Sequence, residues 1–385
     1  MRVLLAPDSF KGSLASVEAV RVMDRGLRHV FPDVETVPFP MADGGEGTAR
    51  ALREIIGGQD INVSVTDPLG RKRRASYLWV AQQRLAVIET ASASGLPLLA
   101  EQERDPARAS SYGTGLLIRH ALDQGADTLI LGLGGSATVD GGMGLLRALG
   151  ARFTDSKGEE LRGDGASLLR VAQADLTGLD PRLRRVDVIL ATDVENPLLG
   201  PEGAVSVFGP QKGIQSRDIP TYEAGMNRYA EVMRRVTGRD ERRAPGSGAA
   251  GGIGFGLLSC LGCWRESGFD LIASQGGLME KMAEVDLVFT GEGCFDSQSF
   301  YGKVPVSIGR MAKRLDVPVI AFAGRIEGEQ VTLPNVGISL LVPIVDKTMS
   351  LAEALDQAEP LLEKAVWRVA TAIKLGSGRD QQSRR

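Results

Sequence analysis

Residues 128–142 of the chain read T-L-I-L-G-L-G-G-S-A-T-V-D-G-G, and this stretch decides how the fold is interpreted. It opens with the short apolar run L-I-L at 129–131, as a strand buried on both faces of a parallel sheet does. The run then breaks into glycines interleaved with Ser136 and Thr138, and a helix is predicted over residues 143–150. A strand, a glycine-rich turn and a helix start in this order are typical of an α/β protein.

The same turn is a candidate anion site. Glycine has no Cβ, so backbone N–H groups can converge on a phosphate, and the N-terminus of the following helix adds partial positive charge. Gly134, Gly135, Ser136 and Thr138 are therefore candidates to bind phosphate. Taken alone, the stretch is equally consistent with a tight βα turn that binds no ligand.

Length and composition indicate a folded protein of two domains. A chain of 385 residues is long for one hydrophobic core, and its 43% hydrophobic and 24% charged residues are ordinary for a globular protein. A net charge of −3 gives no bulk attraction to nucleic acid or acidic membranes. No apolar run approaches the roughly 20 residues of a membrane span, and no signal peptide is expected. With three cysteines, a disulfide framework is not expected and the cytoplasm is the predicted compartment.

The two ends of the chain share a texture of short apolar strands followed by helices. We therefore predict one α/β domain built from residues 1–70 and 283–385, with a second α/β domain, residues 71–282, inserted between them. The active site is expected in the cleft between the two domains. The predicted strands of the two ends lie at residues 3–6, 35–39, 61–66, 285–290, 317–323 and 338–342.

Polar side chains follow the first two predicted strands. Asp8, Ser9 and Lys11 come directly after the first strand, and Asp43 and Glu46 lie in a glycine-rich turn after the second. Open α/β sheets bind ligands at the carboxyl ends of their strands, so these residues are predicted to contact the substrate. Asp8 and Ser9 could instead cap their turn, and the two acids of the glycine-rich turn could favour a helix N-terminus or hold a metal.

Further along the chain, Asp193 follows the apolar run at 186–191, and Glu292 and Asp296 follow the run at 285–290, with Lys303 a few residues later. The only two histidines of the chain lie outside any cysteine or carboxylate motif. The chemistry is therefore expected to rest on carboxylates, lysines and backbone amides. That profile suits phosphoryl transfer, in which positioning and electrostatics do most of the work.

Two common nucleotide-binding signatures are absent from the sequence. Lys303 follows a glycine, but no G-x-x-x-x-G-K-[ST] frame surrounds it, which excludes a P-loop. The turn G-L-G-G-S-A has alanine, Ala137, at the last glycine position of a dinucleotide fingerprint, so a nicotinamide enzyme is poorly supported.

Motifs spread over nearly the whole chain resemble, in order, those of the bacterial glycerate kinase family. These motifs are A-P-D-S-F-K-G-S (6–13), M-A-D-G-G-E-G-T (41–48), D-P-L-G-R (67–71), S-Y-G-T-G (111–115), G-L-G-G-S-A-T (132–138), N-P-L-L-G (196–200), F-G-P-Q-K-G (208–213), G-A-A-G-G (248–252), T-G-E-G (290–293), D-S-Q (296–298) and G-K (302–303). The resemblance implies ATP-dependent phosphorylation of glycerate with Mg²⁺, usually giving 2-phosphoglycerate. It also implies that the domain formed by both chain ends is flavodoxin-like, a doubly wound parallel sheet.

Roles for individual residues follow from the resemblance together with the needs of the reaction. Glycerate requires a cation for its carboxylate and an acceptor for its hydroxyl proton, and Mg²⁺ requires acids. We assign Lys11, Asp193 and Asp296 to catalysis, Asp193, Glu292 and Asp296 to the metal, and Lys11 and Lys303 to the substrate. The sequence does not decide which acid is the base.

Cys294 stands where members of the resembled family usually carry arginine, which puts substrate affinity or selectivity in doubt. Two rival functions stay open: a non-catalytic small-molecule binding protein with the same two domains, and a kinase for a related small hydroxy acid. The expected partners are glycerate and ATP, without nucleic acid or membrane, and the sequence indicates no oligomeric state.

Overall fold

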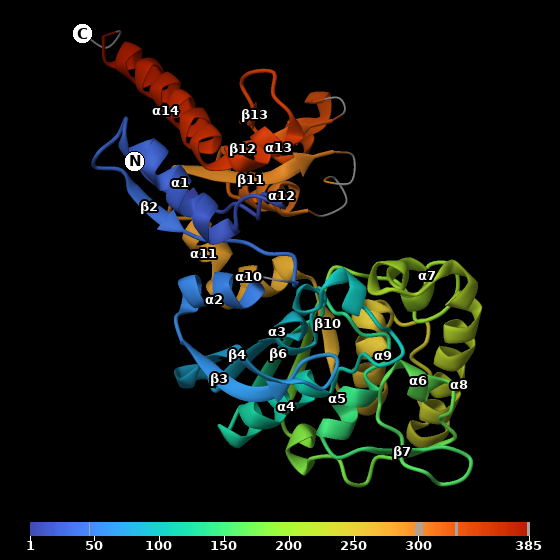
Figure 1. The fold of residues 1–385 in the computed structure, drawn as a ribbon. Coiled ribbons are helices and arrows are strands. Elements are labelled where there is room, and N and C mark those ends of the chain that lie inside the picture. The colour runs from blue at the N-terminus through green and yellow to red at the C-terminus, as the bar shows by residue number, and fades with distance from the viewer. Residues whose placement is uncertain (46, 297–298, 300–302, 328–329, 383–385) are drawn as a thin grey trace. The chain divides into compact units, whose positions relative to one another are not determined.

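The structure is a computed structural model of the chain (Figure 1). It describes residues 1–45, 47–296, 299, 303–327 and 330–382. The chain divides into two compact units, which we call the terminal unit and the inserted unit. The terminal unit consists of Met1–Asp43, Arg50–Gly57 and Phe269–Arg385. The inserted unit consists of Gly44–Ala49 and Gly58–Gly268.

The terminal unit is built on a five-stranded sheet in the order β2-β1-β11-β12-β13, and all of its pairings are parallel. In chain order within the unit this is 2-1-3-4-5, the flavodoxin-like order, which confirms the predicted fold. Val3 pairs with Leu287, so the two ends of the chain share one sheet, as expected. The strands are β1 (Arg2–Leu5), β2 (Glu35–Pro38), β11 (Leu287–Phe295), β12 (Val319–Ile326) and β13 (Leu340–Pro343).

Helices of the terminal unit cover both faces of this sheet because successive strand residues alternate between the faces. Ile320 and Phe322 pack toward α1 and α14, which lie side by side (Figure 1). Ala321 and Ala323 pack on the opposite side, in a cluster that includes Val306 of α12. The helices are α1 (Ser16–Arg28), α2 (Thr48–Ile56), α10 (Gly268–Gly276), α11 (Leu278–Met282), α12 (Val304–Arg314), α13 (Leu351–Asp356) and α14 (Ala358–Gln382).

The inserted unit has a six-stranded mixed sheet in the order β10-β9-β6-β5-β4-β3. The pairs β5–β6, β6–β9 and β9–β10 are parallel, whereas β3–β4 and β4–β5 are antiparallel. The apolar run that opened the sequence analysis is β6, central in this sheet and buried. The strands are β3 (Gln59–Thr66), β4 (Lys72–Val80), β5 (Leu85–Glu89), β6 (Thr128–Gly132), β9 (Asp187–Ala191) and β10 (Trp264–Glu266), with a separate hairpin of β7 (Arg152–Thr154) and β8 (Gln173–Asp175).

The boundaries between the units differ from those predicted at residues 70 and 283. β3 was expected in the domain built from the chain ends, but it pairs with β4 over eight residues, from Gln59↔Trp79 to Thr66↔Lys72, and so belongs to the inserted unit. Residues 269–282, expected in the insertion, form α10 and α11 of the terminal unit. The basic residues Lys72–Arg74 lie inside β4.

Helices of the inserted unit enclose one large apolar core that also takes side chains from its sheet. They are α3 (Thr90–Ser94), α4 (Tyr112–Asp123), α5 (Met143–Ala148), α6 (Gly165–Leu168), α7 (Ala204–Phe208), α8 (Ile219–Thr237) and α9 (Ala249–Cys260). Among the residues that the structure describes, no helix combines the length and apolar character needed to cross a bilayer.

Candidate active site

Predicted residues of the terminal unit gather where its parallel strands end. The turn after β1 places Asp8 beside β11, because the amide of Asp8 donates to the carbonyl of Gly291 at 2.9 Å. The Asp8 carboxylate accepts a hydrogen bond from the amide of Ser9 at 2.7 Å. The turn therefore brings Asp8 next to the part of β11 that carries Glu292, as the rule for carboxyl ends of parallel strands predicts.

Lys11 and Asp43 form an ion pair at this edge. Lys11 follows β1 and Asp43 follows β2, and their Nζ and Oδ2 atoms are 3.0 Å apart. The Lys11 side chain is 76% exposed, so its ammonium is accessible to a ligand. Asp43 first, and then Asp8 and Glu292, raise the pKa of Lys11 by attraction. Lys11 is thus a protonated, accessible cation surrounded by acids.

Glu292 and Asp296 share the ammonium of Lys303. Lys303 Nζ lies 3.4 Å from Glu292 Oε2 and 3.2 Å from Asp296 Oδ1. Glu292 was expected after its strand, but β11 continues to Phe295, so Glu292 lies within the strand and is only 5% exposed. Burial raises the pKa of Glu292 to about 6, although Lys303 opposes the shift. Its other oxygen, Oε1, is buried without a hydrogen-bond partner among the described residues.

Asp296 is held in place by its own turn. Its Oδ1 accepts a hydrogen bond from the amide of Ser299 at 3.1 Å, and its amide donates to Ser299 Oγ at 3.1 Å. The Cys294 thiol lies 3.9 Å from Asp296 Oδ2. Lys303 and Ser299 already share one oxygen of this carboxylate, Asp296 Oδ1. A ligand that binds Asp296 would therefore share the carboxylate with these two residues.

The carboxylates assigned to the metal fall into different parts of the molecule. Glu292 and Asp296 belong to the terminal unit, whereas Asp193 follows β9 in the inserted unit, where it is exposed and accepts a hydrogen bond from the amide of Gly268 at 3.0 Å. Within the described residues, no group of three or more His, Cys, Asp or Glu side chains is arranged to hold a metal ion. Glu46, predicted to bind substrate, lies outside the described residues.

The glycine-rich turn after β6 presents a row of backbone donors. Gly134 is partly exposed and Gly135 is exposed, with φ of +64° at Gly135, a conformation that favours glycine. No other described residue accepts a hydrogen bond from the amides of Gly134, Gly135, Ser136 or Thr138. Amide groups without partners on a glycine-rich turn are suited to an anion.

The helix that follows the turn does not contribute as expected. We predicted that its N-terminus would help to bind phosphate, but α5 has only six residues and its first amides are already in use. The Asp140 carboxylate accepts hydrogen bonds from the amides of Gly142 at 2.9 Å and Gly144 at 3.3 Å, and from the amide and hydroxyl of Ser111 at 2.7 Å each. Asp140 is fully buried, so this helix start is occupied by a structural carboxylate.

Two residues that sequence reasoning missed support the turn. Thr90 donates its hydroxyl to the carbonyl oxygens of Gly132 and Gly134, each at 3.0 Å. Lys212, to which the sequence analysis gave no role, is 3% exposed and donates to the Ser136 hydroxyl and the Thr138 carbonyl, each at 2.9 Å. Lys212 belongs to the motif F-G-P-Q-K-G (208–213), which could have marked it as a functional residue. The glycines and the proline of this motif instead suggest an exposed turn.

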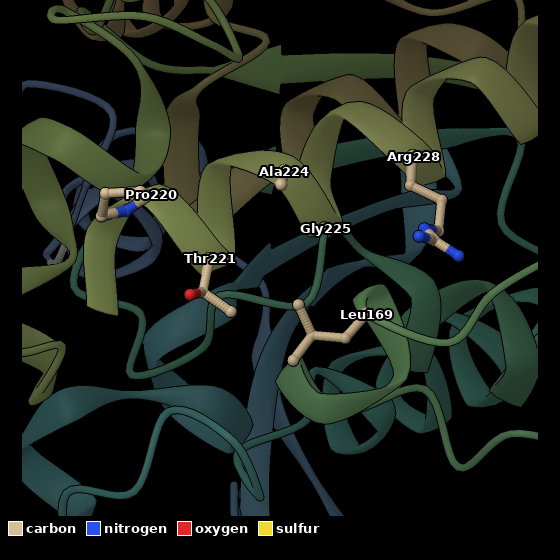
Figure 2. Close-up of a pocket in the computed structure, with 6 residues that line it drawn as sticks. All are labelled: Leu169, Pro220, Thr221, Ala224, Gly225 and Arg228. Atoms are coloured by element: carbon tan, nitrogen blue, oxygen red, sulfur yellow. The ribbon is translucent and has the colours of Figure 1, made fainter. Parts of the chain in front are cut away.

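The inserted unit also has a surface pocket that none of the predicted site residues lines. The pocket has a volume of about 360 Å³. Figure 2 shows that Arg228 and Thr221 of α8 line it opposite Leu169, which follows α6. Its remaining lining residues are Pro220, Ala224 and Gly225. None of them was predicted to bind substrate, nucleotide or metal, so this pocket has no place in the candidate site.

Comparison with known proteins gives one family. A family model described as "Glycerate kinase family" matches residues 3–374. The match includes the terminal strands and every predicted site residue. The family therefore applies to both units.

Individual relatives are similar over their full length. The chain is 41% identical over 375 residues to a glycerate kinase of Bacillus subtilis (strain 168), covering 97% of this chain and 98% of that protein. It is 40% identical over 376 residues to the glycerate 2-kinase of Escherichia coli (strain K12), covering 98% and 99%. A crystal structure from Salmonella typhimurium LT2, provisionally assigned as a glycerate kinase 2, superposes with a TM-score of 0.87 at 39% identity and covers 98% of this chain and 99% of that chain.

Proposed function

The chain belongs to the glycerate kinase family, whose members are kinases with an alcohol group as acceptor, and on this premise we propose that it transfers the terminal phosphoryl group of ATP to glycerate. We propose 2-phosphoglycerate as the product. The observation that carries this proposal is the similarity to the Escherichia coli glycerate 2-kinase over 98% of the chain. We place the reaction in the cytoplasm, where the three cysteines stay reduced.

The cluster of the terminal unit has the groups that glycerate needs. Lys11 is an exposed cation for the carboxylate of glycerate or for the transferred phosphoryl group, and Lys303 is the second candidate. Asp43 forms an ion pair with Lys11, Asp8 attracts it, and Ser9 lies two residues before it in the chain. We propose that these three residues offer hydrogen bonds to the hydroxyl groups of glycerate. Glu46, although undescribed, stays in this proposed set.

Proton acceptance falls to a carboxylate. The acceptor hydroxyl of glycerate must lose its proton as the phosphoryl group arrives. We propose Asp296 for this step and Asp193 as the alternative. Asp296 Oδ1 lies 3.2 Å from Lys303 Nζ, so the proposed proton acceptor is next to a cation that can contact the anionic substrate.

Magnesium fits the described residues as an ion that arrives with the nucleotide. Mg²⁺ commonly takes one or two protein carboxylates and completes its shell with phosphate oxygens and water, so a three-residue protein cage is not required. Glu292 and Asp296 would hold it, with Asp193 as a third candidate, and the buried Glu292 Oε1 lacks the partner that a cation would supply. When bound, the ion neutralises charge on the phosphates.

The glycine-rich turn is proposed to bind the phosphates of ATP. Gly134 and Gly135 offer accessible amides, and Ser136 and Thr138 add hydroxyl groups close behind them. Phosphates are commonly held by such runs of backbone N–H groups.

Product analysis tests the proposed function. Purified protein is incubated with ATP, Mg²⁺ and a panel of glycerate, lactate, tartronate and glycerol, and phosphorus NMR identifies the product. We expect consumption of ATP with glycerate and formation of 2-phosphoglycerate. Formation of 3-phosphoglycerate would correct the regiochemistry, and turnover of another hydroxy acid would correct the substrate. Tight binding of glycerate or ATP without turnover would favour a binding protein.

A further inference from the structure

A buried lysine lies directly behind the glycine-rich turn. The ammonium of Lys212 donates to Ser136 Oγ and to the carbonyl oxygen of Thr138, each at 2.9 Å. A Cβ built on Gly251 would lie 1.9 Å from the Thr138 oxygen and 3.1 Å from Lys212 Nζ. The backbone at the start of α9 therefore covers the lysine on one side, and the turn covers it on another.

No counter-ion accompanies this buried cation in the described part of the chain. Lys212 forms no ion pair with a described carboxylate. Asp140 attracts it from a longer distance, but the Asp140 carboxylate is already engaged by Ser111, Gly142 and Gly144. Burial lowers the pKa of Lys212 to about 7, which shows how poorly its charge is compensated. A buried ammonium in this state is stabilised by any anion that comes near.

Two hydroxyl protons also lack acceptors at the turn. An ammonium only donates hydrogen bonds, so Ser136 Oγ must accept the bond from Lys212 and point its own proton elsewhere. No other described residue accepts that proton. Thr138 is fully buried, and its Oγ1 has no partner among the described residues. Buried polar groups are rarely left unsatisfied unless a ligand or water completes them.

We propose that Lys212 is a positioning residue for a bound polyphosphate: it supplies positive charge behind the turn at residues 134–138 and directs the Ser136 hydroxyl proton toward the anion. The proposal rests on the proposed function in taking the phosphates of ATP as that anion. The amides of Gly134 and Gly135 bind the phosphates directly, and Lys212 acts through Ser136 and through its charge. This gives the lysine a role in nucleotide affinity that is separate from glycerate binding.

Replacement of the lysine tests this role. Lys212→Met keeps the length of the side chain and removes its charge, whereas Lys157→Met removes one charge from an exposed lysine of the same unit and serves as the control. Calorimetry measures the Kd of a non-hydrolysable ATP analogue and of inorganic tripolyphosphate, and steady-state kinetics gives the KM for ATP and the KM for glycerate. We expect Lys212→Met to raise the Kd of both anions ~10-fold or more, which is the range of a charge-assisted hydrogen bond. The KM for glycerate should stay unchanged. Lys157→Met should match the wild type.

Ser136→Ala tests the same bond from its other end. It keeps Lys212 and removes the hydroxyl, so we expect weaker nucleotide binding with the melting temperature retained. The double variant should bind no more weakly than Lys212→Met alone, because the two side chains act through one hydrogen bond. Wild-type nucleotide affinity in a folded Lys212→Met, or in Ser136→Ala, would overturn the proposal. If Lys212→Met does not fold, Ser136→Ala decides alone.

The outcomes separate this proposal from the proposed reaction. Loss of tripolyphosphate binding in Lys212→Met, without glycerate phosphorylation by the wild type, would support the lysine's role and refute the reaction. Glycerate phosphorylation with normal nucleotide affinity in both variants would support the reaction and refute the lysine's role. A wild type that binds neither anion would refute both.

Discussion

At the scale of single residues, we expect Lys11 to act mainly in substrate binding and Asp296 mainly in the chemical step. Lys11 attracts an anionic substrate before and during the reaction, so Lys11→Ala should raise the KM for glycerate about 10-fold or more and change kcat little. Asp296→Asn keeps the shape of the side chain but removes a proton acceptor, and should lower kcat by ~10²-fold or more. Steady-state kinetics on both variants measures these effects.

Melting curves control for folding in these variants. Arg53→Ala, at a half-buried position of α2 in the same unit, removes a cation that was assigned no role and should keep both kinetic constants. Normal turnover by Asp296→Asn would move the catalytic role to Asp193. A fall in kcat with an unchanged KM in Lys11→Ala would instead place Lys11 on the transferred phosphoryl group.

The buried carboxyl of Glu292 should give the protein a distinctive pH dependence. Its pKa is raised from 4.5 to about 6, so the folded state favours the protonated form. The stabilisation is fully present below pH 4.5, is lost as pH rises through 6, and amounts to about 2 kcal/mol for this size of shift. Glu292→Gln does not titrate. The free energy of unfolding of the wild type relative to this variant should therefore fall by about 2 kcal/mol between pH 4.5 and pH 7.

Urea titrations in metal-free buffer at several pH values measure this difference. Subtracting the variant from the wild type removes the contribution of all other groups that titrate alike in both proteins. A difference that stays constant with pH would mean that Glu292 has an ordinary pKa. A difference that rises with pH would mean that the ion pair with Lys303 outweighs burial.

The sequence predicted candidate site residues where a charged residue directly follows a strand. It did not predict residues that are buried by contacts with segments far away in the sequence. Lys11, Asp43 and Lys303 became candidates because strand ends of a parallel sheet meet at one edge. Lys212 was not recognised as a site residue because a lysine between glycines normally faces water. Its burial follows from the packing of Gly251, far along the chain, against Thr138. Local patterns hold no information about that contact.

At the scale of elements, the packing of α1 on α14 depends on one glycine. A Cβ on Gly26 would lie 2.8 Å from the carbonyl oxygen of Glu363 and 2.9 Å from the Cβ of Val366. Gly26→Ala should push the helices apart and destabilise the protein by about 1–3 kcal/mol, the usual cost of overpacking. Chemical denaturation measures the change. The kcat per folded molecule should be unchanged, because Gly26 is not one of the proposed site residues.

Gly376→Ala is the matched control, since Gly376 also lies in α14 but has open space around its Cβ position. Alanine is the better helix former there, so stability should stay equal or rise by up to about 1 kcal/mol. Equal stability of Gly26→Ala and the wild type would show that the two helices adjust to the methyl group at no cost.

The elements themselves were predicted unevenly. The strands at 3–6 and 285–290 were confirmed, because apolar runs are local signals. The partner of β3 was not predicted. It pairs with β4, which begins with the basic residues Lys72–Arg74. A run of charges does not suggest a strand, although alternate residues of an antiparallel strand can face water.

At the scale of the whole molecule, the inserted unit should fold alone. The fragment of residues 58–268 contains all six strands of its sheet and its apolar core. We expect this fragment to melt cooperatively, with calorimetric and van't Hoff enthalpies that agree, as single domains do. The matching fragment for the terminal unit joins residues 1–57 to 269–385 through a short flexible linker.

Circular dichroism and calorimetry on the purified fragments measure these transitions. A fragment of residues 58–268 that stays unfolded would show that the segment Gly44–Ala49 is needed to complete the unit. The close approach of Gly44 to Ala191 makes that segment the first addition to try.

The pairing of β1 with β11 has a consequence for synthesis on the ribosome. Ala6 and Thr290, which share a hydrogen bond across these strands, are 284 residues apart in the chain. At 5–20 residues per second, the first strand waits roughly 15–60 s for its partner. Until β11 is made, β1 can pair only with β2, so its apolar side chains, buried in the finished protein, lack most of the sheet that surrounds them there. We therefore expect chaperones to bind the nascent N-terminal segment during translation.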